Sequence, residues 1–586
     1  MTNLRRRACL AILAGAAAAT TVGATTATAD DTRPAALVDG PREHETTVQL
    51  LSFNDFHGHL EAEDGQTLDE ESDPQGRVVG GAEYLAATLD RLRAQADGRS
   101  LTVAAGDLIG GSTFLSGLFH DEPTVESMEA LGLDVTSVGN HEFDEGTTEL
   151  LRMQYGGCHP DAGCYFPGEP YDGAEFDWLA ANVELKNSDE TLLPPYDVRT
   201  VDGVQVGFIG MTTDTTPGLV SPSGVATVDF LDEVQTANRY ARELSSQGVK
   251  TIVVLLHEGG FQTGEFDECE GISEPVVGIA QQLDPQIDAV VTGHTHEPYL
   301  CNIPDPQGQP RMVTSAASFG GVVTELDLVV NTRSGQVKRD QVEASNHLVL
   351  RDGVEPDAEQ TSIIEKWDAI AAPIAGEVVG TVAQDITGDS NGNRAIETPM
   401  ADLVADAILW GTSGENGGAQ VAFMNVGGVR SSFLVDDISD QEQRGEVTYS
   451  EAFDVAPFGN LLVTMDLTGA QIEEVLEQQY QPIPARGSRP MLALGVSEGF
   501  GYTWDASRPQ GERVVPGSMT LDGQPVVADQ TYRVATLNFL AEGGDSFTAF
   551  GQGSNVLGGA EDLANLVSFL KAHPGLTPPE DRVGGL

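Results

Sequence analysis

Through the first half of the chain, short apolar runs rich in β-branched residues alternate with amphipathic stretches of helical periodicity. The apolar runs predict strands over residues 47–53, 101–105, 134–138, 204–209, 251–256, 289–292, 312–315 and 322–330. The amphipathic stretches predict helices over residues 81–95, 125–131 and 233–246. Alternating strands and helices are typical of an α/β fold, in which helices cover the faces of a sheet.

Five polar motifs stand at the ends of these predicted strands. They occupy residues 54–58, 106–107, 139–144, 257–258 and 293–296. Taken singly, a Gly-Asp pair means little, and a histidine at a strand end is more often a satisfied core residue. Active sites in open α/β sheets gather outside the carboxyl ends of the strands. The whole series, each motif behind a strand, therefore predicts one common site.

The residue types in the motifs suit a pair of divalent metal ions. Aspartate, asparagine and histidine supply oxygen and nitrogen donors without a thiolate, a set that favours Zn, Mn, Fe or Co. Asp107 is the natural bridging carboxylate, because its motif lies in the middle of the set. Glycines before Asp107, Asn140 and His294 let the chain turn sharply as it leaves the sheet.

The character of the chain changes near residues 355–376. A charged stretch at 357–371 predicts a helix, which is followed by Pro373 and a strand-like run at 376–382. Beyond it, the pattern predicts helices at 400–410 and 469–479, strands at 421–425, 461–467 and 531–537, and a final outer helix at 560–572. With 586 residues, two large domains are expected.

The N-terminus predicts export. Arg5, Arg6 and Arg7 precede a short Ala-rich apolar stretch and a small-residue cleavage site ending at Ala29, which together indicate a signal peptide over residues 1–29. Residues 30–45 are expected to form a mobile leader. No later run is long and apolar enough to span a bilayer, so we expect a secreted protein without a membrane span. The export route and any attachment to the cell wall stay open.

The cysteines fit an oxidising compartment. Cys9 falls in the signal peptide, and the four others favour two disulfides, Cys158–Cys164 and Cys269–Cys301. Other pairings are arithmetically possible, and a zinc site is a competing interpretation.

The formal net charge of −59, with 90 acidic residues against 31 Lys and Arg, disfavours nucleic-acid binding. Cations close to the site must therefore attract any anionic substrate.

The series Asp-x-His, Gly-Asp, Gly-Asn-His-Glu, His and Gly-His-x-His resembles the signature of calcineurin-like metallophosphoesterases. The longer motifs at 54–58 and 139–144 resemble the branch of 5′-nucleotidases and 2′,3′-cyclic-nucleotide phosphodiesterases. The resemblance implies an α/β fold: a four-layer α/β/β/α metallophosphoesterase domain followed by a smaller mixed α/β substrate-binding domain. The implied divisions are residues 46–350, a helical connector at 351–376, the second domain at 377–555, and a C-terminal helix and tail at 556–586.

The resemblance also implies roles for the motif residues. One ion would be held by Asp55, His57, Asp107 and His296, and the other by Asp107, Asn140, His257 and His294. His141 would hydrogen-bond the reacting phosphate, and Asp144 would orient His141. A metal-activated hydroxide would attack phosphorus in line with the leaving group. Several relatives carry an amide at the position of His296, which leaves the identity of the metal open.

Three segments of the second half, at 425–430, 456–460 and 538–547, resemble the substrate-binding domain of 5′-nucleotidases. Phe458 and Phe539 would sandwich a nucleobase, and Asp545 would accept hydrogen bonds from ribose hydroxyls. The phosphate or sugar groups would be held by Arg394, Asn425 and Arg430. Val426, Glu542 and Ser546 depart from the usual pattern, so the preferred base and phosphate chain length stay open.

The sequence thus predicts a secreted phosphohydrolase that releases phosphate from nucleotides. Two alternatives use the same metals: a 2′,3′-cyclic-nucleotide phosphodiesterase with 3′-nucleotidase activity, and a UDP-sugar hydrolase. More distant alternatives are a thiosulfohydrolase and a noncatalytic surface-binding protein. We also expect the two domains to rotate about the connector. The sequence does not fix the oligomeric state.

Overall fold

The structure is a computed structural model that describes residues 44–586, apart from 63–64, 70, 97, 161, 167, 221–223, 389–392, 415–416, 439–441, 483–485 and 487–488. The predicted signal peptide at 1–29, and all of the predicted leader except its last two residues, lie outside the described residues. Of those two, Glu45 begins the first strand.

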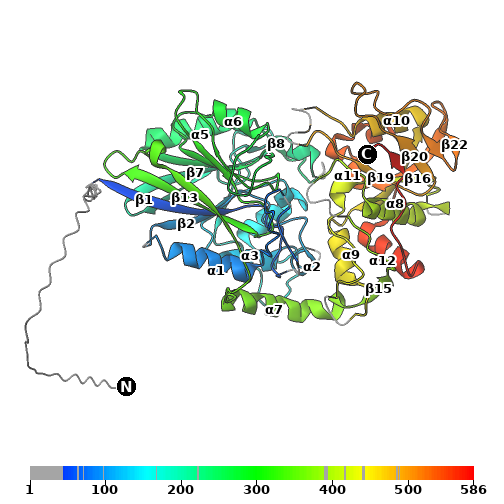
Figure 1. The fold of residues 1–586 in the computed structure, drawn as a ribbon, viewed down its shortest axis with the longest axis horizontal. Coiled ribbons are helices and arrows are strands. Elements are labelled where there is room, and N and C mark those ends of the chain that lie inside the picture. Colours follow the sequence, from blue (N-terminus) through cyan, green and yellow to red (C-terminus); the bar gives the residue numbers. More distant parts are fainter. Residues whose placement is uncertain are drawn as a thin grey trace, which may run out of the picture. The chain divides into compact units, whose positions relative to one another are not determined.

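Two six-stranded sheets form the centre of the first domain (Figure 1). The parallel strands of the first sheet are β1 (Glu45–Phe53), β2 (Ser100–Ala104), β3 (Val135–Ser137) and β4 (Asp177–Leu179). Beyond β1 the sheet continues with the antiparallel strands β13 (Val322–Asn331) and β14 (Glu343–Leu348). In the second, β7 (Val204–Thr212), β9 (Thr251–His257), β10 (Ala289–Thr292) and β12 (Met312–Ser315) run parallel between the antiparallel edges β6 (Tyr196–Val201) and β11 (Tyr299–Asn302).

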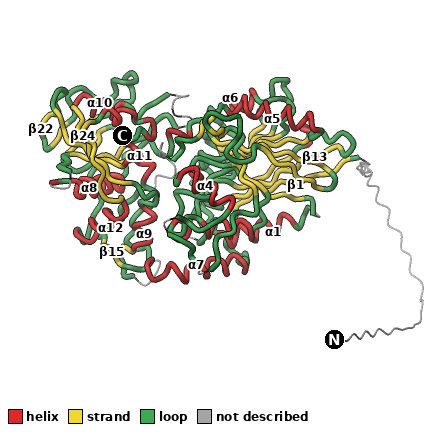
Figure 2. Tube along the Cα trace, turned by 180° about the vertical axis from the view of Figure 1, so that it is seen from behind, coloured by secondary structure: helices red, strands yellow, loops and turns green. Residues whose placement is uncertain are grey.

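Successive side chains of a strand point to opposite faces of its sheet, and this alternation explains how the two sheets stack. Val48 and Leu50 of β1 share a buried cluster with Val253 and Leu255 of β9, so the two sheets pack face to face. The opposite face of each sheet is covered by helices, α1 (Ala82–Arg93) and α3 (Glu122–Ala130) on the first, and α5 (Glu233–Gln247) and α6 (Val276–Gln282) on the second. Figure 2 shows α5 and α6 on one side of the strands and α1 on the other. The predicted four-layer α/β/β/α arrangement is confirmed.

A five-stranded sheet organises the second domain, in the order β19 (Leu494–Val496), β16 (Val421–Asn425), β23 (Thr531–Leu537), β18 (Leu461–Thr468), β24 (Ser554–Glu561). Ala422 and Met424 of β16 pack with α8 (Pro399–Thr412) and α12 (Asp562–Ala572), whereas Val421 and Phe423 pack on the other side with α10 (Gly469–Glu477). A small sheet of β20 (Phe500–Thr503), β21 (Thr520–Leu521), β22 (Gln524–Pro525) and β25 (Val583–Gly584) lies beyond α10, and β15 (Val378–Thr381) pairs with β17 (Glu446–Thr448). This is the mixed α/β domain that the sequence predicts.

The connecting helix α7 (Ala358–Ala375) is longer than predicted. Asp357 caps its start by accepting hydrogen bonds from two backbone N–H groups of the first turn. Its end lies two residues beyond Pro373, so our prediction that the helix stops before this proline is wrong. Gln360 hydrogen-bonds Ser127 of α3, and the Trp367 indole donates to Glu126, so α7 is fastened to the first domain.

The C-terminal segment differs from its predicted form. Strand β24 continues to Glu561, so the last helix begins at Asp562 rather than at residue 560. Near the end of the chain, Val583–Gly584 pairs in parallel with β20. Residues beyond 555, expected to be a helix and tail, therefore supply strands to the five-stranded sheet and to the small sheet of the second domain.

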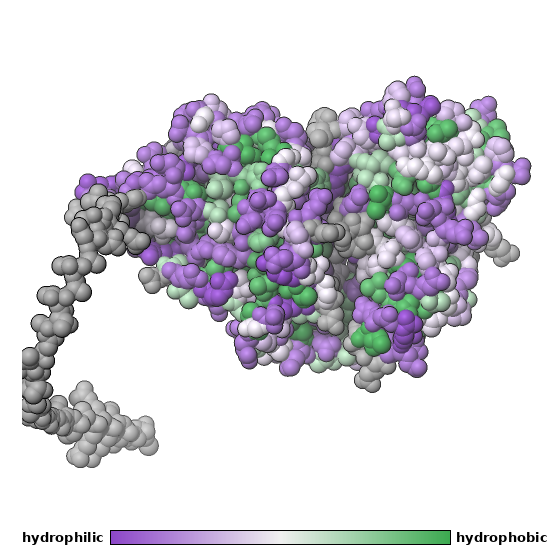
Figure 3. Space-filling view, viewed as in Figure 1, coloured by the Kyte–Doolittle hydropathy of each residue, from purple (hydrophilic) through white to green (hydrophobic). Residues whose placement is uncertain are grey.

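Both predicted disulfides, Cys158–Cys164 and Cys269–Cys301, are present. Among the described helices, none combines the length and the apolar character that crossing a membrane requires. The face drawn in Figure 3 is mostly hydrophilic, as the excess of acidic residues leads one to expect.

Candidate active site

The predicted metal ligands converge at the carboxyl ends of the central strands. Asp55 follows β1, Asp107 follows β2, and Asn140 follows β3 in the first sheet. From the second sheet, His257 is the last residue of β9, while His294 and His296 follow β10. Because the two sheets are stacked, side chains separated by up to 241 residues meet in one place.

The donor atoms form two groups that share Asp107. In the first group, His57 Nε2 lies 3.7 Å from Asp107 Oδ2, and His296 Nε2 lies 3.4 Å from Asp55 Oδ1. In the second, His257 Nε2 lies 2.9 Å from Asp107 Oδ2. Asn140 Oδ1 lies 3.2 Å from His257 Nε2 and 2.9 Å from His294 Nδ1. Asp107 Oδ2 thus lies between donors of both groups.

The backbone at these residues is strained. Asp55, His57, Asp107, His294 and His296 all have φ between 48° and 73°, a region that side chains with a Cβ rarely adopt. Such strain persists only where the surrounding structure enforces it, and it clusters at functional sites.

Gly139 shows how tightly the turns are packed. A Cβ placed there would lie 2.1 Å from Asp107 Oδ1, so only glycine leaves room for this carboxylate.

Two of the histidines are prepared to bind metal ions. The Nδ1 atoms of His57 and His257 each lie 2.7 Å from a backbone carbonyl oxygen, of Gly110 and Ala105 respectively. A carbonyl oxygen only accepts, so each Nδ1 carries the proton in the neutral ring, and the Nε2 lone pair points into the site. His57 Nε2 is buried and has no hydrogen-bond partner among the described residues.

Without a cation in the site, the carboxylates favour a protonated His257. Burial alone would lower the pKa of His257, but the Asp107 and Asp55 carboxylates raise it to about 10. Burial would raise the pKa of Asp107, but His257 and His141 hold it below the usual range. The site thus favours positive charge among its carboxylates. The donors fit divalent cations, which when bound supply an activated water and a clamp for phosphate oxygens.

His141 and Asp144, the predicted catalytic pair, lie beside this cluster. His141 Nδ1 is 2.8 Å from Asp144 Oδ2, and the backbone N–H of His141 donates to Asp107 Oδ1 at 2.8 Å. Burial would lower the pKa of His141, but Asp144 and Asp107 raise it above its usual value. A protonated His141 would present Nε2–H as a donor to an anionic group.

Sequence reasoning assigned no role to Glu142, although it stands inside the 139–144 motif. Its carboxylate accepts hydrogen bonds from the backbone N–H groups of Asp107 (2.9 Å), Leu108 (2.8 Å) and Gly139. Burial raises its pKa to about 7. Glu142 therefore ties the turn that carries Asp107 to the turn that carries Asn140. Its position within a polar motif behind a predicted strand was the available signal.

Two residues of the second domain reach the cluster. The ring of Phe458 lies nearly parallel to that of His141, with 5.9 Å between centroids and 22° between planes. The guanidinium carbon of Arg430 is 5.9 Å from the Phe458 centroid. These contacts bring an aromatic face and a cation beside the candidate catalytic histidine.

The other predicted substrate residues lie nearby in the second domain. Asn425 Nδ2 donates to Asp545 Oδ2 at 3.0 Å, and the Arg394 side chain approaches the backbone of Gly427. Phe539 is packed against Gly544, where an added Cβ would lie 2.4 Å from the ring. Its stacking opposite Phe458 stays a prediction.

Arg489 is a further cation that the sequence did not reveal. Its Nη2 donates to the backbone carbonyl of His294 at 3.2 Å, so a guanidinium from the second domain meets the turn of a predicted ligand. Burial lowers its pKa, and its Nε has no hydrogen-bond partner within the described part of the chain. No motif surrounds it, so sequence alone gave no signal.

Comparison with known protein families divides the chain into the same two domains. Residues 49–298 match the family model of calcineurin-like phosphoesterases, and residues 378–552 match that of the 5′-nucleotidase C-terminal domain. The cell wall protein Lmo0130 of Listeria monocytogenes is 32% identical over 563 residues, covering 89% of this chain and 67% of that protein. The endonuclease YhcR of Bacillus subtilis is 33% identical over 536 residues, covering 91% of this chain and 40% of that protein.

The crystal structure of a 5′-nucleotidase precursor from Thermus thermophilus has the same fold, with a TM-score of 0.73 at 28% identity, covering 92% of this chain and 99% of that one. The site and fold together define a metal-dependent phosphoester hydrolase. The chain belongs to the 5′-nucleotidase family, whose members join a calcineurin-like phosphoesterase domain to a 5′-nucleotidase C-terminal domain. It spans less than half the length of the Bacillus endonuclease.

Proposed function

We propose that the protein is an exported phosphohydrolase that releases phosphate from nucleotides. The observation that supports this most is the Phe458 ring, which lies 5.9 Å from the ring of His141. An aromatic face is the natural partner of a nucleobase, because every base has a π-face. A base stacked there would bring its phosphate towards the histidine and aspartate cluster.

In this proposal two divalent ions, Zn, Mn, Fe or Co, occupy the two donor groups. Asp55, His57 and His296 hold one, Asn140, His257 and His294 hold the other, and Asp107 bridges them. The donor atoms of Asp55, His57 and His296, and those of Asp107, His257 and His294, lie within 4.8 Å of one another in each set. Oxygen and nitrogen donors of this kind suit these metals.

The chain's own groups orient the phosphate. Asp144 holds the imidazole of His141 through Nδ1, so that Nε2–H is presented to a phosphoryl oxygen and stabilises the charge that develops on it. Arg430 and Arg489 supply positive charge at the same place. Such local cations are needed because the chain carries a formal charge of −59.

Cleavage of phosphodiesters is the second candidate function, since one relative is named an endonuclease. The acidic surface argues against long nucleic acids and favours a small diester such as a 2′,3′-cyclic nucleotide. UDP-sugars are a third substrate class that uses the same cluster. We place the protein outside the cell because the N-terminus has the pattern of a signal peptide and two disulfides are formed. One relative is named a cell wall protein.

A substrate panel tests the proposal. The purified protein, supplied with Mn²⁺ or Zn²⁺, is incubated with AMP, ATP, UDP-glucose, 2′,3′-cyclic AMP and bis-p-nitrophenyl phosphate, with an Asp107→Ala, His294→Ala double variant as the blank. Phosphate release from AMP at the highest kcat/KM supports the nucleotidase proposal. Preference for the cyclic diester would favour the second candidate. Turnover of no nucleotide by metal-loaded protein would refute the proposal.

A further inference from the structure

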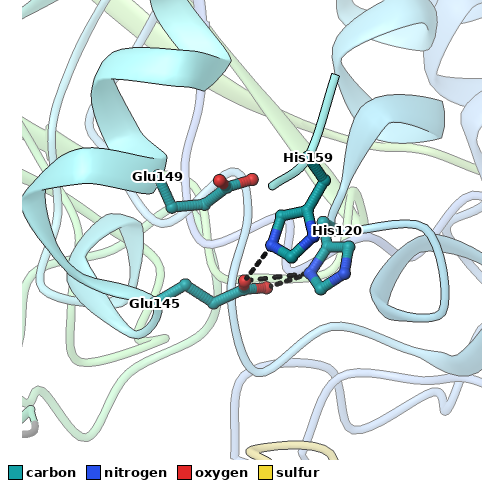
Figure 4. Close-up of side chains that lie close together, drawn as sticks. All are labelled: His120, Glu145, Glu149 and His159. Atoms are coloured by element: carbon teal, nitrogen blue, oxygen red, sulfur yellow. Dashed lines mark hydrogen bonds and ion pairs between the residues drawn. The ribbon is translucent and has the colours of Figure 1, made fainter. Parts of the chain in front are cut away.

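A second group of histidines and carboxylates shares no residue with the catalytic cluster (Figure 4). It consists of His120, Glu145, Glu149 and His159, and is called the outer cluster here. Each side chain offers one donor atom, and the four atoms lie within 4.8 Å of one another. Neither the family motifs nor the proposed nucleotidase chemistry uses these residues.

Three local structures hold the outer cluster. His120 lies in the turn between α2 (Phe114–Gly117) and α3, with φ of 48°. Glu145 directly precedes α4 (Gly146–Tyr155), and Glu149 follows four residues later on the same helix face. His159 stands in the loop that the Cys158–Cys164 disulfide closes. The donors are thus fixed by a helix, a turn and a covalent loop.

The side chains are directed towards a common space, as Figure 4 shows. His120 Nδ1 lies 2.8 and 2.9 Å from the two carboxylate oxygens of Glu145. His159 Nε2 lies 3.9 Å from Glu145 Oε2, and the two imidazole rings stack with their centroids 3.7 Å apart. Tetrahedral zinc with bonds of about 2.0–2.2 Å separates its donors by roughly 3.3–3.6 Å. The donor atoms now lie between 2.8 Å and at most 4.8 Å apart, so binding would require the two stacked rings to tilt and the donors to move by up to about 1 Å.

The charge around the outer cluster favours a cation. Glu149 and Glu122 both pair with Arg152, each with a closest N–O distance of 2.6 Å. Glu145 pairs with His120 and His159 instead, so the three carboxylates outnumber the one guanidinium. Both contacts of Arg152 with Glu149 are made with Oε1, so Glu149 can keep this ion pair and still offer Oε2.

The pKa values of the two histidines are shifted in opposite directions. Burial would lower the pKa of His120, but the Glu145 carboxylate raises it above the usual value. Burial, together with the neighbouring His120, lowers the pKa of His159. At neutral pH His159 is therefore uncharged, which is the state that ligates metals.

We propose that the outer cluster binds one transition-metal ion such as Zn²⁺ through His120, His159, Glu145 and Glu149. Two imidazole nitrogens and two carboxylate oxygens are a donor set for zinc or cobalt rather than for calcium or magnesium, which prefer oxygen alone. This site is separate from the two-metal centre and lies outside the family's catalytic motifs.

The outer site binds its ion more weakly than the catalytic centre does. In the catalytic cluster, His57 and His257 already donate through Nδ1 to backbone carbonyls. In the outer cluster, His159 Nδ1 accepts a hydrogen bond from the backbone N–H of Ala162 at 3.0 Å. Ligation through Nε2 moves the proton to Nδ1, so this hydrogen bond must be released. A mild chelator should therefore empty the outer site first.

The site is connected to the catalytic turns through the chain. His120 precedes Asp121, whose carboxylate accepts from the backbone N–H of Gly110, the residue whose carbonyl holds His57. Glu145 follows Asp144, which holds His141. An ion at the outer cluster would therefore stabilise both turns without touching substrate.

The test measures bound Zn²⁺ by equilibrium dialysis in a full-length chain whose catalytic site is disabled by Asp107→Ala and His294→Ala. We expect about one bound Zn²⁺ per chain fewer after adding His159→Gln or Glu149→Gln to this background. His347→Gln is the matched control. His347 also pairs with a glutamate, Glu325, at 2.9 Å, but belongs to no group of three or more metal-binding side chains among the described residues. Unchanged zinc content in the outer-cluster variants would overturn the proposal.

A second measurement separates ligation from misfolding. Co²⁺ added to the disabled background should give the visible absorption of four-coordinate cobalt, and His159→Gln should abolish it while far-ultraviolet circular dichroism stays unchanged. Zn²⁺ should also raise the Tm of the background and of the His347→Gln control, but not that of the Glu149→Gln variant. A cobalt spectrum or Tm shift that survives loss of the outer cluster contradicts the site.

Discussion

The catalytic cluster and the substrate-contact residues of the second domain are built in different ways. In the catalytic cluster the backbone sets the side chains: five predicted ligands have positive φ, and Glu142 ties two turns together through backbone N–H groups. Among the predicted contact residues of the second domain only Asp545 has a positive φ, and its 3.0 Å hydrogen bond with Asn425 is made between side chains.

This difference separates chemistry from selectivity. Ligands fixed by strained backbone have few alternative positions, so the cluster keeps one geometry for any ester it receives. Side chains on loops such as those around Phe458 and Asp545 can change by substitution without disturbing a sheet. The comparison predicts that changes in the first region affect all substrates, whereas changes in the second affect nucleotides alone.

The largest effect is expected for Asp107→Ala. Removing the carboxylate that both donor groups share should lower kcat/KM for every substrate by at least about 1,000-fold, since metal clamps supply several kcal/mol of transition-state stabilisation. Steady-state kinetics and metal analysis together measure it. Asp288→Asn is the control, because Asp288 is also a buried aspartate, but it precedes β10 at the opposite end from His294. Comparable losses in both variants would contradict the bridging role.

A smaller loss, of about 10- to 100-fold in metal affinity or activity, is expected for Glu142→Gln. The amide accepts through one oxygen only, so it cannot serve the backbone N–H groups of Asp107, Leu108 and Gly139 as the carboxylate does. The effect should be equal for AMP and for bis-p-nitrophenyl phosphate. Metal titration and kinetics on both esters measure it.

The control for Glu142 comes from the second domain. Glu451 also accepts a backbone N–H, that of Thr448, in the capping box of α9 (Tyr449–Val455). Glu451→Gln should leave metal affinity unchanged, because glutamine can also complete a capping box, as Gln471 does at α10. If Glu142→Gln leaves metal affinity and turnover unchanged, the backbone hydrogen bonds that Glu142 accepts do not position Asp107.

Much of the first region could be predicted from sequence, because its signals are local. Each motif follows an apolar run, and the continuous apolar sequence of β9 is typical of a strand that is buried on both faces. The role of Glu142 could not be predicted. The backbone N–H groups that a carboxylate can reach depend on how two turns approach each other in the folded chain.

The second region was harder to predict, because its contacts join distant segments. The three loop motifs could be recognised, yet Arg489 carries no pattern, and its contact with His294 spans 195 residues. Our prediction that α7 ends before Pro373 was also wrong. A proline in the last turn of a helix removes one N–H donor but leaves the preceding turns intact. The strands beyond residue 555 are short or exposed and lack alternating hydrophobicity.

Phe458→Ala tests whether the second region selects nucleotides. Base stacking on an aromatic ring contributes about 1–3 kcal/mol, so KM for AMP should rise about tenfold while kcat/KM for bis-p-nitrophenyl phosphate changes little. Phe458→Tyr keeps the ring and should keep the KM. An equal loss on both esters would mean that Phe458 supports His141 rather than a base.

The smallest effect, a few-fold change in KM, concerns the pH dependence of Asp545. Burial raises the pKa of its carboxyl, against the lowering effect of Arg486 and Asn425, so it takes up a proton at a higher pH than an ordinary aspartate does. Only the ionised carboxylate accepts two ribose hydroxyls. As pH falls through the raised pKa, KM for AMP should therefore rise, and it should recover above that pKa.

Asp545→Asn removes this titration. Its KM for AMP should be raised at all pH values and should lose the acid-side increase, while bis-p-nitrophenyl phosphate, which has no ribose, should show the same pH profile in both proteins. Measuring KM and kcat separately from about pH 4, near the pKa of an ordinary aspartate, to pH 8 distinguishes binding from chemistry. An acid-side rise in KM that persists in Asp545→Asn would assign the titration to another group. Ribose recognition would then belong to residues other than Asp545, and the selectivity of the second region would rest on Phe458 and its neighbouring cations.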